Sequence, residues 1–222
     1  RGRLEQAERR LARAVGFFEG VGDDGGVAWS NGLLAYVRLH QGRLDEADAL
    51  SATAYADAAE RGELWGQGMM LVLRASVHLW SGRTDAAVRR AQEGLDAFRD
   101  IGDVFTESQA FAVLARALAL TGRVDDAFRV LDEAKRRIGD STRASAMSLL
   151  LSTAGTAVAT DLGDPETALA RAGSDDVSGL DPTIIGQGDR IAAIGLALAQ
   201  LGRLATAREV VARAAREEPD AG

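Results

Sequence analysis

The chain of 222 residues is 46% hydrophobic and 27% charged, and its formal net charge is −7 at pH 7. This acidic balance, with both signs spread along the chain, argues against direct contact with nucleic acid, and the absence of cysteine excludes disulfides and a cysteine-ligated metal. No apolar run approaches the ~20 residues of a membrane-spanning helix, so we expect no membrane partner and a cytoplasmic location.

Glycines recur along the chain at a nearly fixed interval, with spacings of 40, 40, 40, 41 and 39 residues. The glycines that set this interval are Gly2, Gly42, Gly82, Gly122, Gly163 and Gly202. Each opens a similar phrase, such as GRLDEA or GRVDDA, and an alanine stands five residues after each glycine. A period of this length is typical of a solenoid of stacked helical pairs.

Residues 24–63 form one full period and predict two helices. Asp24 can cap the first helix, whose apolar residues are Trp29, Leu33, Leu34, Val37 and Leu39. Gln41-Gly42 ends this helix, because glycine readily adopts the positive φ that terminates a helix. The apolar stripe of the second helix consists of Leu44, Ala47, Leu50, Ala54 and Ala58.

Repetition of this pattern predicts an all-α fold, a right-handed superhelical α-solenoid of ~40-residue hairpins with six second helices and five first helices. We expect one continuous repeat domain over residues 1–222, with breaks between units near residues 22, 62, 102, 140 and 182. Because the chain opens inside a repeat at Arg1, we also expect it to be a segment of a larger protein.

The fifth unit departs from the others. Its second helix is expected to begin at Asp164-Pro165 and to stop after Ala172. The following residues, Gly173 to Pro182, are rich in Gly, Ser, Asp and Pro and predict a loop. This loop is either part of a functional face or the result of drift in a tolerant segment.

The spacing of small residues resembles the tetratricopeptide repeat. A small residue, a glycine seven residues on and an alanine five further on recur along the chain, as in Ala35, Gly42 and Ala47. The long period is similar to that of the MalT-like arrays in large bacterial regulators. The resemblance implies a module attached to an ATP-binding switch domain, often with a LuxR-type DNA-binding or a cyclase domain. The proline of the family pattern is matched only by Pro219.

Residues that could support catalysis are nearly absent. His40 and His78 stand at different repeat positions, and the period places no third metal ligand beside them. Gly186-Gln187-Gly188 is too short for a dinucleotide fingerprint, and no phosphate-binding loop is present. We therefore expect no catalytic residues, no metal, no cofactor and no enzyme activity.

The tetratricopeptide resemblance implies that the first helix of each pair lines a concave groove. Carried onto this sequence, the groove positions are Trp29, Tyr36, Met69, Ser76, Gln109, Arg116, Thr153 and Asp189. Trp and Tyr at such positions can anchor a peptide or stack on a small ring. The alternative for Trp29 and Met69 is a place in the core, because the core and groove faces of one helix are neighbours.

These observations predict a non-catalytic binding or sensor scaffold of a bacterial multidomain signalling or transcription regulator. Its partner would be a protein, a peptide or a small-molecule effector bound in the groove. The alternative is a structural spacer or a self-association platform without a ligand. Because terminal repeats normally need polar caps, self-association would occur through the exposed terminal repeats.

Overall fold

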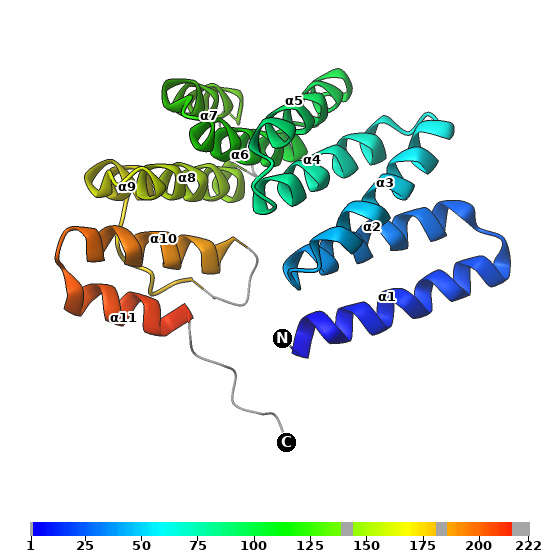
Figure 1. Cartoon of the computed structure of the whole chain (residues 1–222), viewed down its shortest axis with the longest axis horizontal. Helices are drawn as coiled ribbons and strands as arrows, with labels where there is room; N and C mark the ends of the chain where they lie inside the picture. Colours follow the sequence, from blue (N-terminus) through cyan, green and yellow to red (C-terminus); the bar gives the residue numbers. More distant parts are fainter. Residues whose placement is uncertain (1, 139–143, 181–185, 215–222) are drawn as a thin grey trace. The chain divides into compact units, whose positions relative to one another are not determined.

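The computed structural model describes residues 2–138, 144–180 and 186–214, which form eleven α-helices and no strand (Figure 1). The helices are α1 (Gly2–Val21), α2 (Asp24–His40), α3 (Leu44–Glu60), α4 (Leu64–Trp80), α5 (Thr84–Ile101), α6 (Val104–Leu120), α7 (Val124–Ile138), α8 (Ala144–Asp161), α9 (Pro165–Ala172), α10 (Gln187–Gln200) and α11 (Leu204–Ala214). The expected all-α class is confirmed. The breaks expected near residues 140 and 182 lie outside the described residues.

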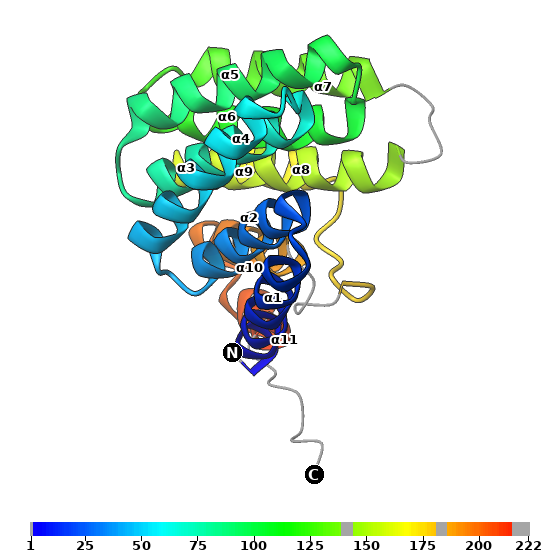
Figure 2. The same ribbon diagram turned by 90° about the vertical axis from the view of Figure 1, so that its right-hand side faces the viewer.

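The chain divides into two compact units, residues 1–117 and 118–222. In the first unit each helix from α1 to α5 packs against the next, and α2 also contacts α4 (Figures 1 and 2). In the second unit α7 to α11 pack in the same consecutive way, and α8 also contacts α10. Contacts of this kind are those of a helical solenoid, in which the first helices of adjacent pairs lie side by side.

Glycine ends the first helix of each pair because the backbone turns there through the left-handed region. Gly42 has φ +75° and Gly82 has φ +72°. The amide of Arg43 then donates to the carbonyl of Arg38 (2.9 Å), and the amide of Arg83 repeats this bond to His78 (2.9 Å). These bonds satisfy carbonyls that the helix end would otherwise leave unpaired.

The alanines that recur with the period form the contact surfaces between helices. These residues, each with no exposed surface, are Ala35, Ala75 and Ala115 on first helices and Ala47, Ala87, Ala127 and Ala168 on second helices. Small side chains allow helix axes to approach closely, so larger residues at these positions would push the pairs apart.

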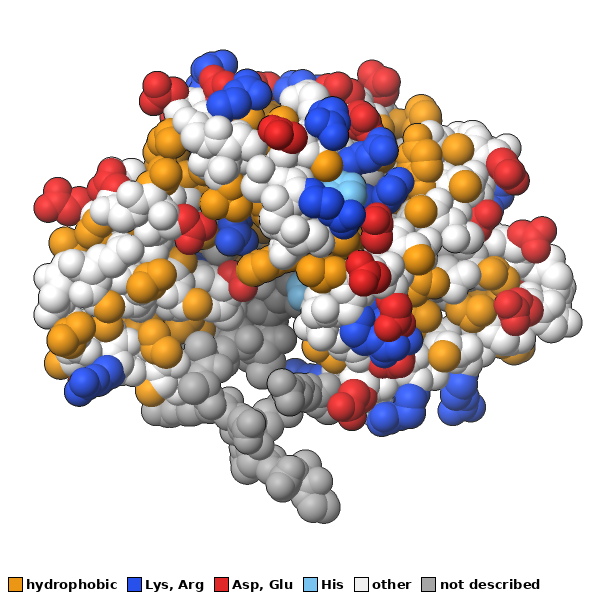
Figure 3. All heavy atoms as spheres, viewed as in Figure 1, with side chains coloured by type: hydrophobic (Ala, Val, Ile, Leu, Met, Phe, Trp, Pro, Cys, Tyr) orange, Lys and Arg blue, Asp and Glu red, His pale blue; other side chains and the backbone are white. Residues whose placement is uncertain are grey.

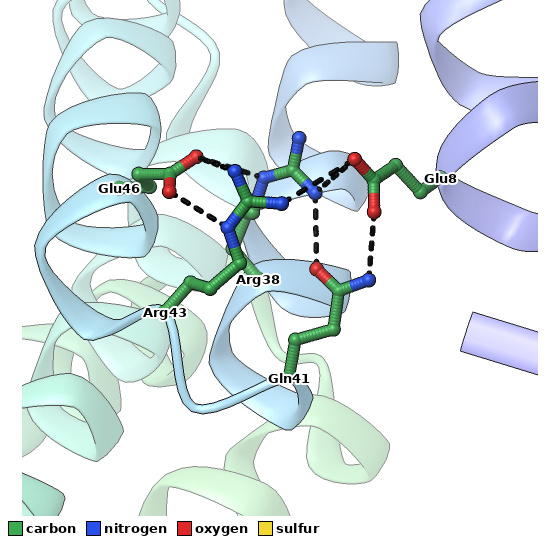
Figure 4. Close-up of polar contacts among 5 residues, drawn as sticks. All are labelled: Glu8, Arg38, Gln41, Arg43 and Glu46. Carbon is green, nitrogen blue, oxygen red and sulfur yellow. Dashed lines mark hydrogen bonds and ion pairs between the residues drawn. The ribbon is translucent and has the colours of Figure 1, made fainter. Parts of the chain in front are cut away.

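A polar network joins the first three helices at the turn after α2 (Figure 4). Glu8 on α1 accepts from Arg38 Nη1 (2.6 Å) and from Gln41 Nε2 (2.7 Å). Arg43 donates through Nε (2.7 Å) and Nη2 (2.6 Å) to Glu46, which lies in the first turn of α3. Because Arg38 also reaches Glu46 (3.2 Å), the network holds α1, α2 and α3 together.

The short helix α9 ends at Ala172, as the sequence predicts, and the described part of the loop that follows is packed. Val177 is buried in a cluster with Ile191, and Leu180 packs against that cluster. Arg190 on α10 is also buried and donates to the carbonyl oxygen of Ala172 (2.5 Å). The loop to residue 180 is therefore tied to α9 and α10, and its last two residues, 181 and 182, lie outside the described residues.

Crossing a lipid bilayer requires a combination of length and hydropathy that none of the described helices has.

Candidate ligand-binding site

An apolar cavity of about 290 Å³ lies between α2, α3 and α4 in the first unit. Its volume is at the lower end of the ~300–1,000 Å³ that small-molecule sites typically have. The lining residues are Gly25, Ala28, Trp29, Gly32, Leu33, Tyr36, Ala54, Ala58, Arg61, Glu63, Trp65, Gly66, Met69 and Met70. Six of these residues are glycine or alanine, so the space exists because small residues face it from three helices.

Two tryptophans stand together in the wall of the cavity. The ring centroids of Trp29 on α2 and Trp65 on α4 are 5.4 Å apart, and their planes are tilted by 31°. Trp29 is 53% exposed and Trp65 is 36% exposed, so the pair lies at the side of the cavity that faces solvent. Large exposed aromatic residues next to a cavity are typical of binding sites.

The ring of Trp65 is held in place from α6. Its Nε1 donates to Oδ2 of Asp103 (3.0 Å). Asp103 also accepts from the amides of Phe105 (3.1 Å) and Thr106 (3.2 Å) and from the Thr106 hydroxyl, so it caps α6. Burial alone would raise the pKa of Asp103, but the bonds from Thr106, Trp65 and Phe105 hold it below its usual value. The carboxylate is therefore ionised at neutral pH and fixes the indole.

The inner wall of the cavity joins the hydrophobic core of the first unit. Met70 is buried with Leu73 in a cluster against which Tyr36 and Met69 pack. The Met70 methyl lies only 3.2 Å from the position of a Cβ at residue 32, so Gly32 makes room for it. Burial raises the pKa of Tyr36 to about 12, so its hydroxyl stays neutral at physiological pH.

The charges of the cavity cancel each other. Arg61 and Glu63 are the only charged lining residues, and Arg61 Nε lies 2.9 Å from Glu63 Oε1. On the face shown in Figure 3, acidic and basic side chains are likewise interspersed, with hydrophobic side chains between them. The site therefore suits an uncharged ligand, because an ion would lose its hydration there without gaining a partner.

The structure brings together three of the eight predicted groove residues, Trp29, Tyr36 and Met69, in this cavity. Two other predicted groove residues, Ser76 on α4 and Arg116 on α6, do not line the cavity and make contacts outside it. Ser76 donates to the carbonyl of its own helix at Val72 (3.1 Å), and the Arg116 guanidinium lies 5.4 Å from the ring centroid of Trp80.

Three further predicted residues are not part of the cavity lining. Gln109 is half-buried on α6. Thr153 and Asp189 belong to the second unit, where Thr153 is buried and donates to the Leu149 carbonyl (2.8 Å), and Asp189 is exposed in the first turn of α10.

Sequence reasoning missed Trp65, Leu33 and Met70 as site residues. The repeat period does contain a sequence signal for Trp65. Trp65 stands one period after Gly25, and Gly25 lies one helical turn before the predicted groove residue Trp29. Position 65 thus falls on the same face of its helix as the groove positions. The rest of the lining depends on how α3 packs between the two first helices.

His78 on α4 is a buried polar residue of the first unit that lies outside the cavity lining. It is 7% exposed, and its Nδ1 has no hydrogen-bond partner among the described residues. Burial and the nearby Arg83 lower the pKa of His78, while Asp48 partly opposes them. The lowered pKa favours the neutral imidazole at pH 7. Among the described residues no group of His, Asp and Glu could hold a metal.

Comparison with protein-family models and with curated proteins finds no match for this chain.

Proposed function

We propose that this chain is a non-catalytic binding module of a bacterial multidomain signalling or transcription regulator, related to the tetratricopeptide arrays, and that its effector binds beside Trp29 and Trp65. The observation that carries the proposal is the pair of exposed indoles over an apolar cavity. Exposed apolar surface of this kind is unfavourable unless it is covered, and a ligand that covers it gains that free energy.

Coupling to an attached domain follows from the position of the cavity. A ligand there touches α2, α3 and α4 at once, so its affinity depends on the relative arrangement of these helices. Any ligand that binds one arrangement better than another shifts the population toward that arrangement. Couplings of this kind typically amount to about 1–3 kcal/mol, which changes an equilibrium by roughly 5- to 150-fold.

One observation favours the alternative of a self-association platform. On α1, Phe17 is 66% exposed and Val21 is 62% exposed, so an apolar strip of this helix faces solvent. If this strip joined two copies, Phe17→Ser would lower the mass measured by analytical ultracentrifugation and leave the cavity unchanged.

Saturation-transfer NMR with a panel of uncharged ring compounds, sugars and short apolar peptides tests the binding function. We expect some panel members to bind the chain, to lose their signal with Trp29→Ala and to keep it with Trp80→Ala. Trp80 is the matched control because its exposed fraction of 60% is close to the 53% of Trp29, but it does not line the cavity. The proposal is wrong if no panel member distinguishes Trp29→Ala from Trp80→Ala.

A further inference from the structure

The cavity occupies a place that is filled by an aromatic ring in the next helical pair. Ala58 on α3 stands one period of 40 residues before Phe98 on α5. Ala28 on α2 stands one period before Gly68 on α4. Both alanines line the cavity. The two pairs of residues therefore show the same helix contact with and without a ring.

In the α4–α5 pair the phenyl ring is fully enclosed. Phe98 has no exposed surface. Its Cε1 lies 2.8 Å from the position that a Cβ would take at Gly68, so the ring rests directly on the backbone of α4. Only glycine fits beneath the ring at that distance, which explains why Gly68 stands opposite Phe98.

In the α2–α3 pair two methyl groups stand where Phe98 and Gly68 meet. Ala58 is 3% exposed and Ala28 is 5% exposed, and both line the cavity. A methyl group at residue 58 occupies far less volume than the phenyl ring of Phe98. One period after Phe98 the same position carries another large residue, Ile138, which is 6% exposed. Among α3, α5 and α7, α3 is therefore the helix that carries only an alanine at this position, and the cavity lies beside it.

The surroundings of the open place suit a flat hydrophobic molecule. Trp29 and Trp65, whose ring centroids are 5.4 Å apart, line the cavity together with Met69 and Met70. Methionine side chains adapt their shape and make favourable contacts with aromatic rings. The single charged pair, Arg61 with Glu63, is already neutralised.

We propose that the cavity binds a small, uncharged, ring-shaped hydrophobic molecule, which takes the place that the Phe98 ring takes in the next pair. This inference rests on the proposed binding function and adds the chemical class of the ligand. A volume of about 290 Å³ limits the ligand to a compact molecule of up to about three fused or linked rings.

N-phenyl-1-naphthylamine is a suitable probe because it is uncharged and its fluorescence rises in apolar surroundings. Its affinity should be measured for the full chain, for the double variant Ala28→Gly/Ala58→Phe and for Ala59→Phe. The double variant recreates the Phe98–Gly68 pair inside the cavity. Ala59→Phe is the matched control, because Ala59 is the exposed neighbour of Ala58 and does not line the cavity.

We expect the full chain and Ala59→Phe to bind the probe equally, and the double variant to bind at least about tenfold more weakly. The sulfonated analogue 8-anilinonaphthalene-1-sulfonate should bind the full chain at least about tenfold more weakly than the uncharged probe, because its charge has no partner in the cavity. Ala58→Ile, which copies Ile138 and fills less of the space, should give an intermediate loss. This single variant keeps the test decisive if the double variant does not fold.

The inference is overturned if neither Ala58→Ile nor the double variant weakens probe binding, or if the sulfonated analogue binds as well as the uncharged probe. If panel ligands then still respond to Trp29→Ala but not to filling of the cavity, the binding function stands and the ligand class is wrong. If no ligand responds to Trp29→Ala, the binding function itself fails.

Discussion

The indole Nε1 of Trp65 donates a hydrogen bond of 3.0 Å to Oδ2 of Asp103, which lies 38 residues further along the chain. The bond connects the first turn of α4 with the cap of α6. One carboxylate thus starts a helix and orients a ring in the wall of the candidate site. A residue outside the cavity lining therefore holds one of the lining rings through a hydrogen bond.

Asp103→Ala should destabilise the chain by about 1 kcal/mol through loss of the cap. It should also weaken the near-ultraviolet circular dichroism of tryptophan, because the ring of Trp65 is no longer fixed. Asp23→Ala is the matched control. Asp23 caps α2 through the Gly26 amide (2.9 Å) and makes no bond to an indole among the described residues. Equal tryptophan signals in the two variants would show that Asp103 does not position the ring.

Two glycines should respond to alanine with opposite signs. Gly82 has φ +72°, so Gly82→Ala should lower the free energy of unfolding by about 1 kcal/mol or more. Gly16 lies inside α1 with no atom within 4 Å of an added Cβ, so Gly16→Ala should raise it by about 0.5–1 kcal/mol. Urea denaturation measures both changes, and two shifts of the same sign would contradict the assignment of Gly82 as a helix terminator.

The helices could be predicted from the sequence because each depends on local signals. Gly42 and Gly82 end helices by their own backbone freedom, and Asp164-Pro165 starts α9 by capping. The recurring small residues, such as Ala47, are buried because a strict period places them at the same contact in each pair. None of these features requires knowledge of distant residues.

The site could be predicted only in part, because it depends on contacts between periods. Trp29 and Met69 were recognisable as residues of a first helix, and the structure places them in the cavity wall. The cavity itself becomes visible only when α3 is seen to pack between α2 and α4, where small residues such as Ala58 line it. Thr153 looked like a polar groove residue, but its hydroxyl bonds to its own helix and the side chain is buried.

The buried His78 should make stability depend on pH. Burial and then Arg83 lower its pKa below the ordinary 6.5, while Asp48 opposes them and Arg74 and Arg90 add smaller effects in the same direction as Arg83. The unfolded chain therefore binds more protons than the folded chain between the lowered pKa and 6.5. The contribution of His78 is fully present above about pH 6.5 and is lost as the pH falls through the folded-state pKa.

Urea denaturation from about pH 7.5 to about pH 5.5 measures this effect. The midpoint should fall toward the lower pH, and His78→Gln should flatten the profile. His40→Gln is the control, since His40 is exposed. A flattened profile in the His40 variant alone would assign the effect to the wrong histidine.

Arg190 should hold the loop after α9 against α10. Its buried guanidinium donates to the Ala172 carbonyl (2.5 Å) and to Ser152 Oγ (2.7 Å). Arg190→Ala leaves both acceptors without this donor. We therefore expect the free energy of unfolding to fall by about 2 kcal/mol and proteolysis between Gly173 and Leu180 to become faster.

Arg203→Ala is the control for this prediction. Arg203 pairs with Asp175 of the same loop at 3.0 Å, but its side chain is 47% exposed, and such pairs contribute about 0–1 kcal/mol. If the two variants are cleaved at the same rate, the buried guanidinium is not what fastens the loop.

The indole N–H signals of the three tryptophans test the candidate site most directly. In a ¹⁵N-labelled chain titrated with N-phenyl-1-naphthylamine, the signals of Trp29 and Trp65 should shift together and saturate with one dissociation constant. The signal of Trp80, which does not line the cavity, should stay in place. A shift of Trp80 alone, or no saturable shift of Trp29 and Trp65, would contradict a binding site between α2, α3 and α4.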